Sequence, residues 1–212
     1  MNVVQFILQN HMEVLDLTTE HLWLVGASIT LAVLIGIPLG ILITRWPGLS
    51  KPVLGGANII QTVPSLALFG FLLPAPWIGA RADRIAILAL MLYALLPLIR
   101  NTYTGIKGVD PAVVEAGRGM GMTDRQLLWQ VELPLALSVI IAGVRVATVL
   151  SIGLATIAAA IGAGGLGEFI FRGLAMVNNQ VILAGAIPAA ALAILADTSL
   201  GWLEKRLSPA KL

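Results

Sequence analysis

The chain of 212 residues contains no cysteine and few charged side chains. Because cysteine is absent, the chain can form neither disulfide bonds nor a thiolate metal site, and redox chemistry does not indicate its compartment. Only 11% of the residues are charged, whereas 58% are hydrophobic. This composition excludes an ordinary soluble domain and is typical of a protein that crosses a membrane several times. The length leaves room for one such domain.

The features of a catalytic or nucleotide-binding site are missing as well. His11 and His21 lack the spacing of metal ligands, and we interpret them as residues of the membrane interface. The glycine run at 162–167 lacks the lysine and the Ser or Thr of a P-loop. It is better explained as a turn from which a short helix folds back towards the membrane. The net charge of +2 indicates no nucleic-acid surface. We therefore expect no enzyme active site, no metal and no cofactor.

What the chain does contain is apolar stretches that are each long enough to cross roughly 30 Å of hydrocarbon. They cover residues 21–46, 52–73, 85–106, 135–162 and 181–203. The first twenty residues lack the basic region of a removable signal peptide and predict a short helix on the outer membrane surface. The predicted fold class is an all-α polytopic membrane protein with five transmembrane helices. Its predicted parts are an outer interfacial segment, a transmembrane domain and a cytoplasmic tail, at 1–20, 21–206 and 207–212.

The second stretch carries polar side chains on one helical face. Residues three, four and seven positions apart share a face of a helix, and this spacing is met by Asn58, Gln61, Thr62 and Ser65. Pro64 lies among them and frees a backbone carbonyl, which a water-filled cavity or a neighbouring helix can satisfy. The stripe predicts a helix that lines a translocation path. The alternative is that these side chains only form hydrogen bonds to neighbouring helices.

Two charged residues lie deep within the fourth and fifth stretches. Arg145 is roughly ten residues in from the preceding loop, and Asp197 is about two turns in from the polar end of the fifth stretch. A charge near the middle of a membrane costs about 2.5–3.5 kcal/mol, so it is expected to have a partner. We predict that Arg145 and Asp197 interact, directly or through a subunit contact, as a structural ion pair rather than as a substrate site.

The long polar segment at 110–134 has the signals of two helices. Asp110 can cap a helix that begins with Pro111, because proline at this position loses only an amide that had no partner. Two glycines then stop this helix. Thr123 and Gln126 have the spacing of a capping box, which predicts the start of a second helix. Pro134 either ends that helix or opens the next transmembrane span.

The first of these predicted helices has an apolar face with a small centre. The face is formed by residues at helical spacing, namely Val113, Ala116, Gly117 and Met120. Small residues let another backbone come close, so this face suits a groove on a partner protein. The alternative is a surface helix that contacts only lipid headgroups.

This segment resembles the EAA loop of ABC importer permeases. The likeness rests on Glu115 to Gly117, on Gly121, and on the run Val131 to Pro134; the family consensus has alanine at 117 and isoleucine at 131. In that family the loop forms the coupling helix, which docks on the ATP-binding subunit. The resemblance thus assigns ATPase coupling to Glu115, Ala116, Gly117, Gly121, Val131, Leu133 and Pro134.

Basic residues indicate the orientation of the chain. If the EAA-like loop is cytoplasmic, nine of the thirteen Lys and Arg residues lie inside, Arg145 lies in a span, and three lie outside, namely Arg81, Arg84 and Arg172. This distribution agrees with the positive-inside rule. We therefore predict an N-terminus outside, a cytoplasmic C-terminus, and a cytoplasmic coupling helix between the third and fourth spans.

Three further segments, at 58–74, 95–111 and 162–174, resemble the permeases of osmoprotectant importers, the glycine betaine, carnitine and choline group. The resemblance implies a multi-pass protein of the bacterial cytoplasmic membrane. It also implies a second permease subunit, identical or paralogous, two ABC ATPase subunits, and an external binding protein that delivers the substrate. ATP hydrolysis would then belong to the ATPase subunits, and no nucleic acid is involved.

Two alternatives remain open at this point. Methionine importers have permeases of similar size with a comparable glycine run, so an amino-acid importer is the nearer alternative. An ion-coupled secondary transporter would need coupling-ion residues near the middle of the membrane and, as a rule, an internal repeat, which this sequence lacks. Disabling a partner ATPase would separate an ABC importer from an ion-coupled carrier, because only the importer would lose transport.

Overall fold

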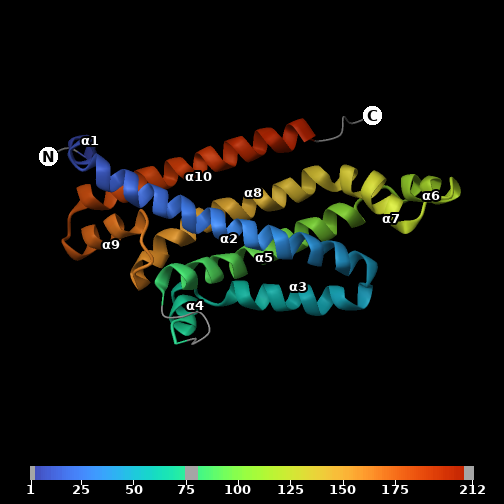
Figure 1. Cartoon of the computed structure of the whole chain (residues 1–212), viewed down its shortest axis with the longest axis horizontal. Coiled ribbons are helices and arrows are strands. Elements are labelled where there is room, and N and C mark those ends of the chain that lie inside the picture. The colour runs from blue at the N-terminus through green and yellow to red at the C-terminus, as the bar shows by residue number, and fades with distance from the viewer. Residues whose placement is uncertain (1–2, 75–80, 208–212) are drawn as a thin grey trace.

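The computed structural model describes residues 3–74 and 81–207, and every regular element in these ranges is helical (Figure 1). The helices are α1 (Val3–Gln9), α2 (His11–Arg45), α3 (Pro47–Thr62), α4 (Ser65–Leu72), α5 (Ala82–Lys107), α6 (Pro111–Gly119), α7 (Asp124–Leu127), α8 (Leu133–Ala158), α9 (Gly167–Ala175) and α10 (Asn179–Leu207). A π-helical segment at Leu128–Glu132 joins α7 to α8, and a 3₁₀ turn follows α8 at Ala159–Ile161. The all-α prediction is thus confirmed for the described residues.

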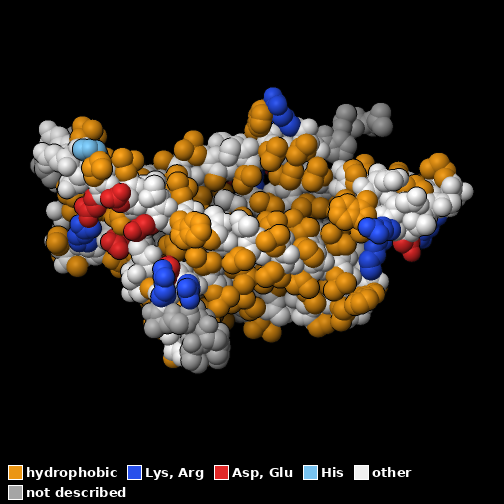
Figure 2. Space-filling model, viewed as in Figure 1, with side chains coloured by type: hydrophobic (Ala, Val, Ile, Leu, Met, Phe, Trp, Pro, Cys, Tyr) orange, Lys and Arg blue, Asp and Glu red, His pale blue; other side chains and the backbone are white. Residues whose placement is uncertain are grey.

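The long helices form an elongated bundle whose two ends differ (Figure 1). We call the end that carries α6 and α7 the α6 end, and the opposite end, with α1 and α9, the α9 end. Most of the charged side chains visible on one face gather towards these ends, whereas the middle is largely hydrophobic (Figure 2). Within the described ranges, four helical stretches are long and apolar enough to span a membrane: α2, α5, the run from Asp124 to Ile161, and α10.

The second predicted span is not one helix. The axes of α3 and α4 differ by 98° at a short break. The described residues therefore hold four candidate spans, or five if this bent pair is counted as one span. Pro64 explains the break, because proline disfavours a helical conformation in the residue before it, and Val63 is extended with ψ 131°. The Tyr93 hydroxyl donates a hydrogen bond to the Val63 carbonyl, which the break leaves free. The prediction of a continuous helix over 52–73 was therefore wrong.

Other predicted boundaries also shift. The expected interfacial helix is α1, but α2 begins already at His11, and its 35 residues extend about 50 Å, well beyond the hydrocarbon thickness. The second helix of the polar loop does not end at Pro134, because α7 continues through the π-helical segment into α8. Most of the predicted tail at 207–212 lies outside the described residues.

Helix α5 lies at the centre of the bundle and packs against both α2 and α8. Glycines allow these close approaches: a Cβ on Gly36 of α2 would lie 2.9 Å from Leu98, and one on Gly143 of α8 would lie 2.6 Å from Asn101. Small residues at helix contacts are typical of membrane bundles, where van der Waals packing replaces the hydrophobic driving force.

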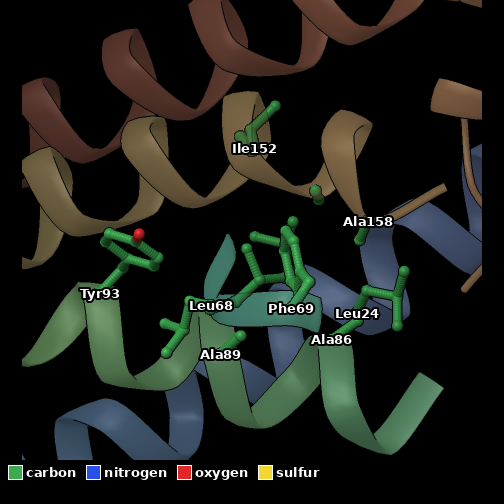
Figure 3. Packing of buried hydrophobic residues seen from close by; sticks show 11 residues of the cluster. Leu24, Leu68, Phe69, Ala86, Ala89, Tyr93, Ile152 and Ala158 are labelled. Carbon is green, nitrogen blue, oxygen red and sulfur yellow. The ribbon is translucent and has the colours of Figure 1, made fainter. Parts of the chain in front are cut away.

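Helix α4 contributes to a core cluster near the α9 end (Figure 3). Its Phe69 is fully buried and lies between α5, α2 and α8, with Ala86, Leu24 and Ala158 among the surrounding residues. The bend at Pro64 thus turns an apolar segment into the core instead of continuing α3 along the bundle.

Candidate functional site

The loop at the α6 end folds as its sequence predicts. The Asp110 carboxylate accepts a hydrogen bond from the Ala112 amide at 2.9 Å and caps α6. Helix α6 ends in a Schellman motif, in which the Met122 amide donates to the Gly117 carbonyl at 3.1 Å. Gly121 supplies the required left-handed backbone, with φ +82°. These bonds give the loop a defined shape.

The capping box at the start of α7 is also present. The Thr123 amide donates to the Gln126 side chain at 2.8 Å, and the Gln126 amide donates to the Thr123 hydroxyl at 3.3 Å. Because α7 runs into α8 without a break, the second half of the loop is the first part of a membrane-crossing helix. Helices α7 and α8 are therefore parts of one continuous helical run.

The predicted small-centred face of α6 is divided between two uses. Gly117 is buried, and a Cβ at this position would lie 2.6 Å from a methyl group of Leu127. The small size of Gly117 thus serves the packing of α6 on α7 within this chain. The remaining side chains face outward, since Val113 and Met120 are 43% and 77% exposed and Ala116 is exposed. Glu115 is exposed beside them.

The π-helical segment carries a buried carboxylate that the sequence analysis did not select. Glu132 is 6% exposed and forms an ion pair with Arg45, the last residue of α2. Its neighbours Val131 and Leu133 are half-buried, whereas Pro134 is exposed and occupies the first turn of α8. The ion pair connects the base of the loop to α2. The position of Glu132 among the basic residues of the α6 end was the signal that could have identified this ion pair.

The structure brings Arg145 and Asp197 together. The guanidinium donates through Nε and Nη2 to the two Asp197 oxygens at 2.6 and 2.8 Å, and through Nη1 to Glu204 at 3.3 Å. Gly201 makes room for it, because a Cβ there would lie 3.0 Å from Nη1. Sequence reasoning missed Gly201 and Glu204, although they follow Asp197 at four and seven positions, on the same face of α10.

The predicted polar stripe is split by the bend at Pro64. Asn58 and Thr62 are exposed on α3 and Gln61 is half-buried, but Ser65 begins α4 beyond the bend. The structure therefore does not place Ser65 on the same helix face as the other three. Gln61 lines a cavity of about 260 Å³ whose other polar side chains are Arg100 and Asn101 of α5.

The glycine run forms the turn expected of it at the α9 end. Gly162, Gly164 and Gly165 have φ values of +79°, +83° and +81°, and α9 follows. The Gly165 amide donates to the Glu20 carboxylate at 3.0 Å. Arg172 of α9 is 2.6 Å from the Glu13 carboxylate of α2. The turn is thus bonded to the first long helix.

The interpretation of His21 as an interfacial residue was wrong. His21 is fully buried, and its Nε2 lies 3.1 Å from the Ile152 carbonyl of α8. This contact connects α2 to α8, so His21 has a structural role between the two helices. Among the described residues, no group of three or more His, Cys, Asp or Glu side chains is arranged to hold a metal ion.

Known proteins resemble this chain over nearly its whole length. The carnitine transport permease protein OpuCB of Listeria monocytogenes is 45% identical over 207 residues, which are 98% of this chain and 94% of that protein. The glycine betaine/carnitine/choline transport system permease protein OpuCD of Bacillus subtilis (strain 168) is 49% identical over 204 residues, which are 96% of this chain and 88% of that protein.

The fold also matches a solved structure. A chain of the MetNI methionine ABC transporter in an inward facing conformation superposes with a TM-score of 0.84 at 22% identity, covering 94% of this chain and 98% of that chain. The family model described as "Binding-protein-dependent transport system inner membrane component" matches residues 25–209. The chain therefore belongs to the family of inner membrane components of binding-protein-dependent transport systems.

Proposed function

We propose that this chain is the permease subunit of an ATP-driven importer of quaternary-ammonium osmoprotectants such as glycine betaine, carnitine and choline. The observation that carries the proposal is identity of 45% and 49%, over almost the whole chain, to permeases named for these solutes. The methionine transporter chain shares only 22% of residues, which supports a common fold and not a common substrate.

The partners follow from the kind of transport system. The permease works with an ATPase, an external binding protein and a second permease subunit. The further proposal is that two ABC ATPase subunits and one more permease, identical or paralogous, complete the complex. A bundle of up to five spans is small for enclosing a pathway. The exposed polar side chain of Asn58 on α3 supports a water-filled path or a protein contact there, because lipid would not satisfy its amide.

Helix α6 is the proposed docking element for the ATPase. Its exposed side chains Val113, Ala116 and Met120 form a small apolar surface next to Glu115, and its backbone is fixed by the caps at both ends. Gly121, Val131, Leu133 and Pro134 act through the shape of the loop and its join to α8. In this proposal the α6 end is cytoplasmic and the α9 end, with the N-terminus, is outside.

The geometry supports a rigid mechanical connection from this loop to the spans. Closure of the ATPase subunits would move α6 together with α7, since Leu127 packs under Gly117. The continuous run from α7 into α8 and the ion pair of Glu132 with Arg45 would carry that movement to α8 and α2. Such a movement would switch the pathway between its outward-facing and inward-facing states.

The test is uptake by vesicles that contain the complete reconstituted complex and its binding protein. Labelled glycine betaine, carnitine, choline and methionine are supplied with and without ATP, and with Glu115→Ala or Gly121→Val in the permease. The proposal expects ATP-dependent uptake of a quaternary ammonium compound and its loss in both variants. Uptake of methionine alone would contradict the proposed substrate class. Uptake without ATP would indicate an ion-coupled carrier instead.

A further inference from the structure

Arg100 lacks the carboxylate partner that other arginines have among the described residues. Arg45, Arg145 and Arg172 each form an ion pair with Asp or Glu. Arg100 of α5 forms none among residues 3–74 and 81–207, and its side chain is exposed. An unpaired charge at membrane depth is costly and marks an ion or substrate path more often than a structural position.

Arg100, which was counted above with the basic residues of the inner side, lies within α5 rather than at its end. Arg100 lies seven residues before Lys107, the end of α5, which corresponds to about 10 Å along the helix. Helical side chains lean towards the N-terminus of their helix, and α5 begins at the α9 end, beside Glu20 and Gly162. The Cα–Cβ bond of Arg100 is therefore tilted away from the α6 end, and its side chain lines a cavity beside α3 and α8.

Its surroundings form a small polar cavity. Arg100 lines the 260 Å³ space with Gln61 of α3, Asn101 of α5, and Val146 and Leu150 of α8. Val146 stands at the middle of α8, so the cavity lies near the centre of the membrane-crossing region. The volume is close to the lower limit of about 300 Å³ for small-molecule pockets. No carboxylate of the described residues lines the cavity.

One wall of the cavity is fixed by close packing. The Asn101 side-chain amide donates to the Pro97 carbonyl at 2.8 Å, and its Cβ packs where Gly143 of α8 lacks a side chain. The opposite side borders α3 through Gln61, and Asn58 and Thr62 of the same helix are exposed. The cavity thus joins a rigid α5–α8 wall to the exposed polar face of α3.

We infer that Arg100 binds the carboxylate of a zwitterionic substrate in this cavity during transport. A guanidinium pairs with a carboxylate through two parallel hydrogen bonds, and Gln61 beside it offers further donors. The apolar side chains of Val146 and Leu150 suit the methyl groups of a quaternary ammonium. This assignment rests on the proposed function and deepens it. Glycine betaine and carnitine carry a carboxylate, whereas choline does not, so the site distinguishes between substrates of one class.

The test compares glycine betaine with choline in the complete reconstituted complex, with ATP and saturating binding protein. Arg100→Gln is expected to lower glycine betaine uptake at least tenfold and to lower choline uptake much less. Arg100→Lys should retain part of the glycine betaine uptake because it keeps the charge. The matched control Lys107→Gln removes a positive charge from the same helix outside the cavity, and should change neither substrate.

A second variant keeps the test decisive if Arg100→Gln does not assemble. Gln61→Glu is nearly isosteric and places a carboxylate in the cavity. This carboxylate would pair with the Arg100 guanidinium and compete with the substrate carboxylate. The same selective loss of glycine betaine uptake is expected. Equal loss of both substrates, no loss of either, or a wild-type complex that carries choline alone would overturn the assignment to Arg100. A wild-type complex that carries no quaternary ammonium compound would instead refute the proposed function, and the assignment with it.

Discussion

The two ends of the bundle are both built from a glycine turn and a short helix, yet they are held in different ways. At the α9 end, α9 and the glycine run are bonded to α2 through Glu13 and Glu20, across more than 140 positions of sequence. At the α6 end, α6 is held by local caps and by Leu127 under Gly117, and much of it stays exposed. Long-range bonds make the first end part of the scaffold, whereas the second presents a surface.

This difference predicts that substitutions at the α9 end mainly change stability and that substitutions on α6 mainly change coupling. Three substitutions test the comparison, in order of decreasing expected effect on the free energy of unfolding.

The largest effect is expected for Gly167→Val at the start of α9. A Cβ on Gly167 would overlap the backbone carbonyl of Thr156 and lie 2.8 Å from the Cβ of Ala159, and backbone atoms cannot move aside at low cost. We expect the free energy of unfolding to fall by about 3 kcal/mol. Thermal unfolding of the purified complex measures it. The matched control is Gly153→Ala of α8, because a Cβ there meets nothing within 4 Å. Equal stability of the two variants would contradict the packing described for α9.

An intermediate effect is expected for Glu132→Gln, at the junction of loop and spans. The substitution leaves Arg45 without its carboxylate, but the Arg45 side chain is 31% exposed and can be partly hydrated. We expect a loss of about 2 kcal/mol in unfolding free energy and a weaker coupling of ATP hydrolysis to uptake. The control Asp124→Asn removes a surface pair with Arg118, both exposed at 3.7 Å, and should change stability by less than about 1 kcal/mol. Unchanged coupling in Glu132→Gln would show that this ion pair carries no movement.

The smallest effect on stability is expected for Met120→Asp on α6. The side chain is 77% exposed, so its replacement removes little packing within the chain. A charge on the apolar docking surface should nevertheless lower ATP-dependent uptake at least tenfold, while the midpoint of thermal unfolding stays within about a degree, as surface changes usually do. Met120→Leu keeps the surface apolar and should retain uptake. A large drop in the unfolding midpoint with Met120→Asp would remove the distinction between the two ends.

The local elements of the α6 end could be predicted well from sequence. Caps depend on residues a few positions apart, so Asp110, Thr123 and Gln126 were sufficient to place the starts of α6 and α7. The use of Gly117 could not be predicted in this way. Helical spacing placed it on an outward face, but the Schellman turn brings Leu127 back against it, and a turn's direction is not encoded in spacing.

The second span shows the opposite outcome. Pro64 was recognised as a special residue, but the spacing of the polar side chains on either side of it led to the prediction of one continuous helix. Burial of Phe69 against α2, α5 and α8 favours the 98° bend. A straight continuation of α3 would not bring this aromatic side chain into that core cluster. The same bend separated Ser65 from Asn58, Gln61 and Thr62.

The sequence by itself determined the all-helical membrane class, the long apolar helices and the caps of the polar loop, because hydropathy and capping act over a few residues or one helix. Only the tertiary structure decided that α4 turns into the core, that Arg45 meets Glu132, that Glu204 joins Arg145 and Asp197, and that Gln61 and Arg100 share a cavity. The ion pairs join residues between 52 and 87 positions apart, and the contacts depend on how closely glycines such as Gly143 and Gly201 allow neighbouring helices to approach.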